Sequence, residues 1–384
     1  MSSFSVVDVV GACMQRSVIC AGVLLCAFFT YFFWFQSSIE YGVPTLRIYN
    51  WAHYIPSSVI KKFESEEGVH VQYAVFDALE TLEAKLLAAR SGYDVVFPPI
   101  LPTGGVFAPA GAFSKLKLKK LPNYKHLDPA VMSFVKRVDP KGRYFIPYLW
   151  GTTGFVYHKH ILSHFKNAPL DSWNLLFSRN WVRRLAPFHV VLLDSPADVL
   201  PDLLMSKGYG PDNFSPNLLN RAMHYLWHIM PFIYKFSSSE TLQDMLAERI
   251  AVAEIFSSYA HMAIAQLRKQ QGKSPYKYVI PKEGALMWID VMAIPKDAPN
   301  KDLAHRFINF LMRPDVMAEV TNKIFAANAI PASKPFLKSW IRDNDTIYPS
   351  RQIMRRLHLD KIPSRAYERK RLHYWALIKS GYAP

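Results

Sequence analysis

The sequence predicts an α/β protein built as two lobes with a cleft between them. Residues 45–97 alternate between strand and helix patterns, which is typical of a parallel sheet covered by helices. A second series of strand and helix patterns begins near residue 144, and no low-complexity linker separates it from the first. The chain of 384 residues is also longer than one hydrophobic core usually serves. Two lobes joined without a linker predict several chain crossings and a cleft in which a ligand binds.

The first series consists of three predicted strands separated by two helices. Apolar residues at alternate positions predict the first strand, and apolar residues on one helical face predict the helices. The strands cover residues 45–51, 69–76 and 93–97, and the helices run from Pro56 to Gly68 and over 79–89. This order predicts parallel strands with right-handed crossovers. Because ligands of such sheets bind at the carboxyl ends of strands, Trp51 and Tyr54 become candidate site residues.

The second series is richer in strands. Strands are predicted over 144–151, 154–157, 189–194, 250–256 and 286–295, and the clearest helices over 218–230 and 303–312. The sequence shows no internal repeat. Half of the chain is hydrophobic and only 20% is charged, which excludes wholesale disorder.

An uncharged apolar segment over residues 18–35 follows Arg16 near the start of the chain and predicts export. It is longer than the ~7–15 residues of a cleavable signal core and close to the ~20 residues that span a bilayer as a helix. A cleaved signal peptide and an uncleaved inner-membrane anchor are therefore both open. In either case, we expect the residues after about 42 to work outside the cytoplasm.

The positions of the cysteines and histidines argue against thiol and metal chemistry. All three cysteines lie in the first 26 residues, which excludes a disulfide framework, a cysteine-ligated metal and a cysteine nucleophile in the body of the protein. His160 and His164 have the helical spacing of zinc ligands, but no carboxylate stands nearby, so a solvated helix start is the favoured interpretation. The sequence has no phosphate loop, nucleophile elbow or zinc-protease motif. We therefore expect no catalytic residue, cofactor or metal.

The chain is strongly basic, with a formal net charge of +16 and a pI near 9.6. Its carboxyl-terminal stretch interleaves arginine and lysine with Tyr367, Tyr374 and Trp375. That pattern favours an alternative function, a basic module that binds membrane surfaces or polyanions. Basic residues on a helix are more often a solvated face, and an exported protein meets little nucleic acid. We therefore expect no nucleic-acid partner.

A series of segments spread over residues 45–380 carries a resemblance to a known family. The segments are LRIYNW at 46–51 with Tyr54, ET at 80–81, AKL at 84–86, YDVV at 93–96, IPYLWG at 146–151, PKEG at 281–284, WID at 288–290, AIP at 293–295 and FINFLMRPDV at 307–316. Together and in this order, they resemble the periplasmic spermidine/putrescine-binding proteins of polyamine ABC importers, a branch of the extracellular solute-binding protein superfamily.

The resemblance implies a type II periplasmic-binding-protein fold whose two lobes close on a ligand by hinge bending, without a chemical step. We expect lobe 1 to consist of residues 43–149 and 291–330, and lobe 2 of residues 150–290 and 331–384, after an export signal or anchor over 1–42. The resemblance also implies a polyamine ligand, an inner-membrane permease and the cytoplasmic ATPase of that permease. The protein is expected to be a periplasmic monomer, with anchoring by residues 18–35 left open.

A polyamine needs carboxylates for its ammonium groups and aromatic faces for its methylenes. Asp290 is two residues from Trp288 in a predicted strand, so both side chains project to one face, and the resemblance makes this Trp-x-Asp motif the centre of the site. Spacing alone would favour a core role for Trp288. Trp51 and Tyr54 match the family's Asn-Trp-x-x-Tyr corner, where both aromatics line the cleft, although their spacing also allows a hydrophobic staple.

The chain departs from the family at several site positions. Ala52 and His53 stand where relatives commonly carry a hydroxyl residue and an acid, and Ser195 stands where a further acid is expected. Residues 194–198 align with a second cluster of acids in the family, and Asp198 keeps one acid of that cluster. A charge at a helix start is an equally good interpretation of Asp198.

Aromatic residues occupy the remaining candidate positions. Phe256 stands where relatives have a cleft tryptophan, Tyr259 where putrescine-specific relatives have an aspartate, and Phe325 near a family tyrosine. Asp290 and Asp198 could still neutralise the two ends of a diamine, whereas internal amines of longer polyamines would be desolvated without full compensation. We therefore expect diamines to lose less affinity than spermidine, relative to the family. A related solute-binding protein with changed small-molecule specificity remains a second interpretation.

Overall fold

The computed structural model describes residues 43–76, 79–88 and 91–383. Its contacts divide the chain into two compact units, Met1–Thr45 with Gly68–His70, and Leu46–Glu67 with Val71–Pro384. In the described part of the first unit, the His70 N–H donates to the Pro44 carbonyl at 2.9 Å. The second unit contains the α/β body. The expected signal or anchor over residues 18–35 lies outside the described residues, and no helix within them is both long and apolar enough to cross a bilayer.

A three-stranded sheet with the order β2-β1-β3 opens the α/β body. Its strands are β1 (Thr45–Trp51), β2 (His70–Phe76) and β3 (Val95–Val96), and the connecting helices are α2 (Ser57–Glu67) and α3 (Leu79–Leu87). β1 and β3 are parallel, which confirms the predicted strand–helix–strand order. β3 is shorter than the expected strand, and beside it the Asp94 carboxylate accepts the Arg47 N–H at 2.8 Å.

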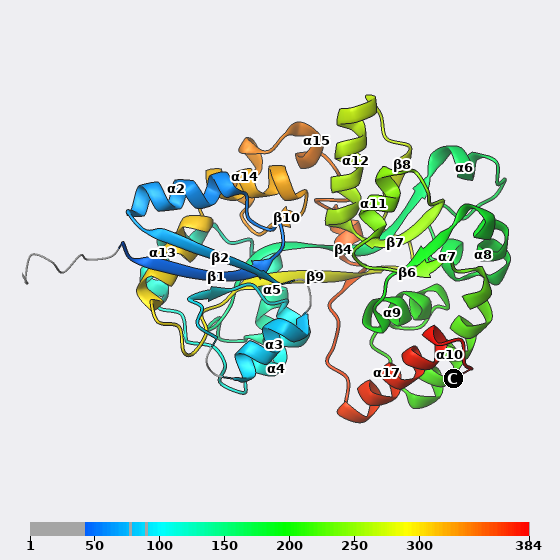
Figure 1. Ribbon diagram of the computed structural model, residues 1–384, viewed down its shortest axis with the longest axis horizontal. Coiled ribbons are helices and arrows are strands. Elements are labelled where there is room, and N and C mark those ends of the chain that lie inside the picture. Colours follow the sequence, from blue (N-terminus) through cyan, green and yellow to red (C-terminus); the bar gives the residue numbers. More distant parts are fainter. Residues whose placement is uncertain (1–42, 77–78, 89–90, 384) are drawn as a thin grey trace, which may run out of the picture. The chain divides into compact units, whose positions relative to one another are not determined.

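The second sheet has the strand order β11-β9-β4-β7-β5-β6, and β8 and β10 also pair with β4. Its strands are β4 (Ile146–His158), β5 (Val190–Leu192), β6 (Lys235–Phe236), β7 (Val252–Phe256), β8 (Tyr276–Val279), β9 (Ala285–Met292), β10 (Ala327–Asn328) and β11 (Leu357–His358). β4 is buried along its whole length. It lies antiparallel to β9 over its first half and to β7 and β8 over its second half (Figure 1).

β4 unites two strands that were expected separately, over 144–151 and 154–157. The residues between them, Thr152 and Thr153, are β-branched and continue the strand. A register shift shows that β4 has an extra residue relative to β9 after Pro147. Such a bulge changes the face to which a side chain points. It brings Tyr148 and Gly151 to the same face, although three positions along a regular strand would place them on opposite faces.

Fourteen further α-helices lie within the described residues. The longer ones are α5 (Pro129–Val138), α8 (Arg179–Leu185), α9 (Pro196–Ser206), α10 (Pro216–Ile229), α12 (Ser257–Gln271), α13 (Lys301–Leu311), α14 (Pro314–Ile324) and α17 (Arg365–Lys379). The shorter ones are α4 (Gly105–Phe107), α6 (Lys159–Ser163), α7 (Asn174–Phe177), α11 (Thr241–Leu246), α15 (Ser339–Arg342) and α16 (Arg351–Met354). The helices predicted over 218–230 and 303–312 are confirmed as α10 and α13.

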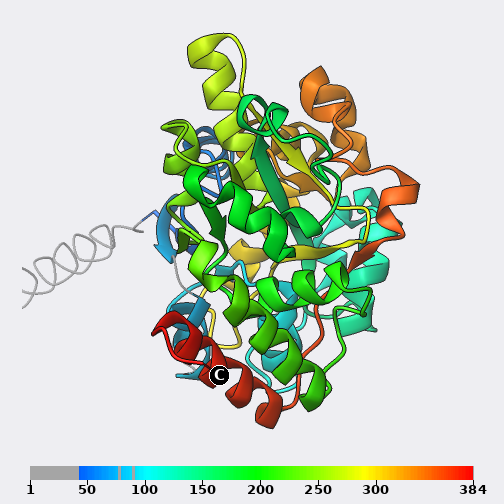
Figure 2. The same ribbon diagram turned by 90° about the vertical axis from the view of Figure 1, so that its right-hand side faces the viewer.

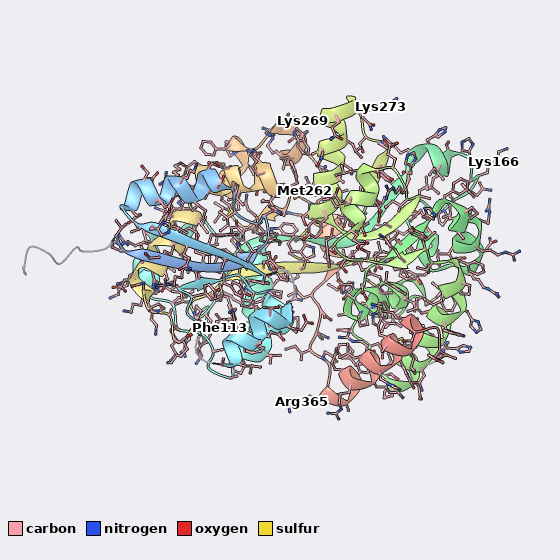
Figure 3. The ribbon with its side chains drawn as sticks, viewed as in Figure 1. Phe113, Lys166, Met262, Lys269, Lys273 and Arg365 are labelled. Carbon is pink, nitrogen blue, oxygen red and sulfur yellow. The ribbon has the colours of Figure 1, made fainter. Side chains whose placement is uncertain are left out.

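The last helix, α17, lies beside α10 in both views (Figures 1 and 2). It begins at Arg365, which Figure 3 labels. Across this contact the Tyr374 hydroxyl donates to Asn220 Oδ1 at 3.1 Å. Trp375 and Ile378 of α17 are buried in a core that also includes residues of α9, α10, β5 and β7. The carboxyl-terminal stretch is therefore part of the fold.

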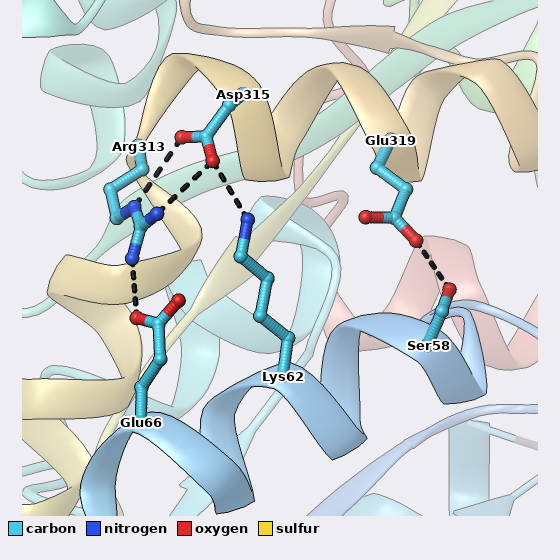
Figure 4. Close-up of polar contacts among 6 residues, drawn as sticks. All are labelled: Ser58, Lys62, Glu66, Arg313, Asp315 and Glu319. Atoms are coloured by element: carbon cyan, nitrogen blue, oxygen red, sulfur yellow. Dashed lines mark hydrogen bonds and ion pairs between the residues drawn. The ribbon is translucent and has the colours of Figure 1, made fainter.

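A network of ion pairs joins α2 to α14 (Figure 4). Lys62 Nζ lies 2.8 Å from Asp315 Oδ2, and Arg313 Nη2 lies 3.1 Å from the same oxygen. Arg313 Nη1 lies 2.5 Å from Glu66 Oε2. Although partial burial works in the opposite direction, the hydrogen bonds from Lys62 and Arg313 lower the pKa of Asp315 to about 2.

The two histidines considered as zinc ligands lie at the ends of a short helix. His160 belongs to α6, and His164 follows its last residue. Their rings meet edge to face, 5.1 Å apart. Across the described ranges, no group of three or more His, Cys, Asp or Glu side chains is placed to hold a metal.

Candidate ligand-binding site

Asp290 lies near the end of β9, with only 6% of its surface exposed. The Tyr54 hydroxyl donates to Asp290 Oδ2 at 2.7 Å. Burial raises the pKa of Asp290 to about 7, against the lowering effect of the Tyr54 hydrogen bond, and no described cation contributes. A buried carboxyl group without a cationic partner is costly to ionise, and a bound ammonium group would supply that partner.

Two further tyrosines surround this contact. The Tyr148 hydroxyl donates to the Tyr54 carbonyl at 2.7 Å. The Tyr148 ring meets the Phe97 ring edge to face, with 4.9 Å between the centroids. Tyr259, in the first turn of α12, is 39% exposed. Burial, and then the neighbouring Asp290, raise the pKa of the Tyr259 hydroxyl. The carboxyl group therefore lies among tyrosines from β4, from α12 and from the connection between β1 and α2.

Trp288 shares the face of β9 on which Asp290 lies, as the period of two predicts. Its neighbour across the ladder is Gly151 of β4. A Cβ atom at Gly151 would lie 2.4 Å from the Trp288 ring and 2.4 Å from Ser257 Oγ. Only glycine at this position lets the indole approach β4 so closely.

Asp198 lies on the other side of Trp288 from Asp290. The Thr153 hydroxyl donates to Asp198 Oδ1 at 3.3 Å, and Thr153 shares the face of Gly151 because it is two residues further along β4. Gly151 pairs with Trp288, and β4 and β9 are antiparallel. Thr153 therefore lies on one side of this pair along the strands, and Asp290 lies on the other side. The two carboxyl groups therefore flank the indole along the strand direction.

The surroundings of Asp198 differ from those of Asp290. Asp198 is in the first turn of α9, which begins after Ser195. Burial raises the pKa of Asp198, whereas hydrogen bonds from Ser195 and Thr153 and the charge of Arg371 in α17 work in the opposite direction. Asp198 is therefore an acid at a helix start that also accepts from Thr153, on the strand face that Trp288 shares. Unlike Asp290, it already has a cation in its surroundings.

Trp51 ends β1, three residues before Tyr54. Its ring packs on Phe76 with 4.5 Å between centroids, and its backbone N–H donates to Asn50 Oδ1 at 2.8 Å. Its indole Nε1 is buried and has no hydrogen-bond partner within the described residues, and the same holds for Nε1 of Trp288.

Phe256 and Phe325 have different surroundings. Phe256 ends β7 and pairs with Thr153 across the ladder, so it faces the side on which Asp198 lies. Phe325 follows α14 with φ of 60°, and its ring lies 5.3 Å from that of Trp340. Phe325 lines a hollow of about 600 Å³ with Met262, Ala265, Gln266, Lys269, Gln270, Lys338 and Trp340. Figure 3 shows Met262 and Lys269 along α12.

The structure thus brings together one part of the predicted set. Tyr54 and Tyr259 lie close to Asp290, Trp288 shares its strand face, and Asp198 and Phe256 lie next to Thr153 on that face. The contacts described for Trp51 and Phe325 lead to Phe76 and Trp340 instead. Sequence analysis did not single out Tyr148, Gly151 and Thr153. The only sequence signal for Tyr148 and Gly151 was their place in the IPYLWG segment.

Known proteins share both the sequence and the fold. The family model of bacterial extracellular solute-binding proteins matches residues 58–345. The putrescine-binding periplasmic protein SpuD of Pseudomonas aeruginosa strain UCBPP-PA14 is 39% identical over 342 residues, which are 88% of this chain and 92% of that protein. The putrescine-binding periplasmic protein PotF of Escherichia coli K12 is 35% identical, with the same coverage of both chains.

Solved structures confirm the predicted two-lobed α/β fold. The substrate-binding protein PotD of a spermidine/putrescine ABC transporter from Streptococcus pneumoniae superposes with a TM-score of 0.75 and 25% identity, covering 88% of this chain and 99% of that chain. The TpPotD lipoprotein of Treponema pallidum gives a TM-score of 0.75 and 26% identity, covering 87% and 99%. The chain therefore belongs to the bacterial extracellular solute-binding protein family, and its function is to bind a solute outside the cytoplasm.

Proposed function

We propose that this protein binds a polyamine beside Asp290 and delivers it to the permease of an ABC importer. The observation that carries the proposal is the buried Asp290 carboxyl group, which accepts from Tyr54 at 2.7 Å, lies on the face of Trp288 and has no described cation to neutralise it. The names of the relatives, putrescine-binding periplasmic proteins at 39% and 35% identity, support the same ligand class.

Binding in this site needs no covalent chemistry. An arriving ammonium group provides the cation that Asp290 lacks, so the carboxyl group releases its proton and forms a charge-assisted hydrogen bond. The Tyr54 hydroxyl donates to the carboxylate, and the Tyr148 hydroxyl holds the Tyr54 backbone by donating to its carbonyl. The Trp288 ring offers a face for cation–π and methylene contacts. We therefore propose a binding protein without catalytic residues or a cofactor.

The arrangement of the acids favours a ligand with more than one ammonium group. Asp290 and Asp198 flank the Trp288 ring, so two positive groups can lie on either side of one aromatic wall. Arg371 weakens the attraction at the Asp198 end. A diamine anchored at Asp290 is the proposed ligand class, with longer polyamines bound less well than in the relatives because their internal amines lack acidic partners.

Internal ion pairs weaken the alternative of a polyanion-binding module. In the basic carboxyl-terminal stretch, Arg371 Nη2 lies 2.6 Å from Glu368 Oε2, and Lys379 Nζ lies 2.6 Å from Asp194 Oδ2. These cations are used within the fold. The alternative would be favoured if the protein binds heparin or anionic vesicles, if this binding weakens with added salt, and if added amines do not change it.

We propose that the protein acts as a periplasmic monomer beside the permease, with residues 18–35 as an anchor. Recovery of the full-length protein with membranes after a high-salt wash supports the anchor. Recovery in the soluble periplasmic fraction, with an amino terminus near Ser38, supports a cleaved signal peptide instead.

Calorimetric titration tests the ligand class. Putrescine, cadaverine, spermidine and spermine are titrated into the purified protein, with butylamine as the control that matches putrescine in chain length and lacks one charge. At least one polyamine should bind in the micromolar range or more tightly, and butylamine should bind at least about tenfold more weakly because one charge-assisted contact is lost. No detectable binding of any polyamine would refute the proposal.

A further inference from the structure

Two carboxyl groups outside the candidate site meet in the interior of the protein. Asp202 of α9 and Glu254 of β7 have no exposed surface and lie within hydrogen-bond reach of each other. Glu254 Oε2 accepts the Leu193 N–H at 3.1 Å. Within the described structure, both oxygens of Asp202 and Oε1 of Glu254 have no hydrogen-bond donor. Two ionised carboxylates in such a place would repel each other without solvation, so both cannot be charged.

A single proton between the two groups removes this conflict. Burial raises the pKa of both carboxyls, and the charge of Glu254 raises the pKa of Asp202 further. The hydrogen bond from Asp202 lowers the pKa of Glu254. The two carboxyls are therefore held together by one proton, which one of them donates to the other. Paired carboxyls of this kind keep their shared proton up to pH values well above the ordinary carboxyl pKa.

The groups that face the pair are acidic or neutral. Asp198 acts on both carboxyls from α9, and Tyr278 of β8 faces Asp202. His261 of α12 packs on the Tyr278 ring, and burial lowers the pKa of His261 to about 4, so the imidazole is neutral. Arg371 of α17 acts on Asp198. Within the described residues, no cation is therefore seen to face the two carboxyls and neutralise them in place of the proton.

The pair connects β7 to the helix that carries Asp198. Asp202 is four residues after Asp198, one turn along the same face of α9. Glu254 accepts from Leu193, at the start of the turn that leads into α9. We propose that Asp202 and Glu254 hold one proton between them, and that this carboxyl pair fastens α9 to β7 and so positions Asp198 beside Trp288. The inference rests on the proposed function only for the part that Asp198 plays in ligand binding.

A shared proton makes folding depend on pH in a defined direction. Because the pKa of each carboxyl is raised in the folded state, the folded pair holds about one more proton than the same two residues hold in the unfolded chain at pH values above about 4, the ordinary carboxyl pKa. The contribution of the pair to stability is then greatest in acid and falls as pH rises, by up to about tenfold in the folding constant per pH unit for each extra proton. In Asp202→Asn, an amide donates to Glu254 and has no proton to lose, so the fall should be shallower.

Thermal unfolding of the ligand-free full-length protein between pH 5 and 8 tests the shared proton. The midpoint should fall more steeply with pH in the wild type than in Asp202→Asn. Asp171→Asn is the matched control, because it removes the same charge from an exposed acid that pairs with Lys282 at 3.1 Å, and it should keep the wild-type slope. Equal slopes for the wild type and Asp202→Asn would overturn the inference.

Comparison of Asp202→Leu with Asp202→Asn tests the positioning role. The leucine variant loses the hydrogen bond to Glu254, so amide protection over residues 196–206 should fall and putrescine should bind more weakly, by about fivefold, whereas the asparagine variant should retain both. Asp202→Ala replaces the leucine variant if the latter does not fold. Unchanged protection and affinity in the apolar variant would overturn the positioning role. If no form binds putrescine while the pH slopes and the protection behave as expected, the proposed ligand is wrong and the carboxyl pair stands.

Discussion

Amine affinity should depend on pH through Asp290. The pKa of this carboxyl in the free protein is raised to about 7 because of its burial, and an ammonium ligand binds the ionised form. Affinity is therefore present above pH 7 and is lost as pH falls through that value. The ligand remains protonated throughout this range, so the change originates in the protein.

The magnitude follows from the fraction of ionised carboxyl. At pH 5.5, about 3% of a group with a pKa of about 7 is ionised, so the apparent dissociation constant should be about 30-fold weaker than at pH 8, equivalent to about 2 kcal/mol. Binding at pH 6 should also release close to one proton per ligand.

Calorimetric titration with putrescine at pH 5.5 and 8 measures the first quantity. Repetition at pH 6 in two buffers with different ionisation enthalpies measures the proton release. Asp290→Asn, which cannot titrate, should bind weakly at both pH values and release no proton. A wild-type dissociation constant that does not change between pH 5.5 and 8, with no proton release, would refute the assignment of Asp290 as the cation's partner.

Three substitutions test other parts of the account. Gly151→Ala places a Cβ atom 2.4 Å from the Trp288 ring, so overpacking should cost about 1–3 kcal/mol in the free energy of unfolding and weaken amine binding, as denaturant titration and calorimetry would show; wild-type values would contradict the contact. Tyr54→Phe removes a hydrogen bond that lowers the pKa of Asp290, so binding should weaken by about tenfold and its pH midpoint should rise; an unmoved midpoint would contradict that role. Arg313→Ala breaks partly exposed ion pairs between α2 and α14, so the unfolding free energy should fall by only about 1 kcal/mol and less so in high salt; a loss that ignores salt would point to packing instead.

The centre of the site could be predicted because it rests on local rules. The period of two in a strand places Trp288 and Asp290 on one face, and the Asn-Trp-x-x-Tyr corner places Tyr54 three residues after the end of β1. The strand–helix order likewise predicts the first sheet, because each of its elements is defined by its own short pattern.

The rest of the site depends on register, which no single segment reveals. The bulge after Pro147 decides that Tyr148 and Gly151 face the same side, and it exists only in the pairing of β4 with β9. The position of Asp198 beside Trp288 follows from the same pairing through Thr153.

Long-range packing accounts for the other residues that sequence reasoning did not place. Phe325 lies against Trp340, and no local pattern links these two rings. Asp202 and Glu254 stood in apolar runs, VLPDLL and VAEIF, and an acid in such a run was a signal of a buried carboxyl. That the two acids meet each other depends on how α9 lies against β7.

The dissociation constant of putrescine for Asp290→Asn, measured beside the wild type at pH 8, tests the central claim most directly. Asp343→Asn is the control, because it removes the same charge from an exposed acid that pairs with Arg342 at 2.8 Å. Asp290→Asn should lose about 1.5–3 kcal/mol of binding free energy, roughly tenfold to more than a hundredfold in the dissociation constant, while Asp343→Asn binds as the wild type does. Equal dissociation constants for the wild type and Asp290→Asn would contradict the account.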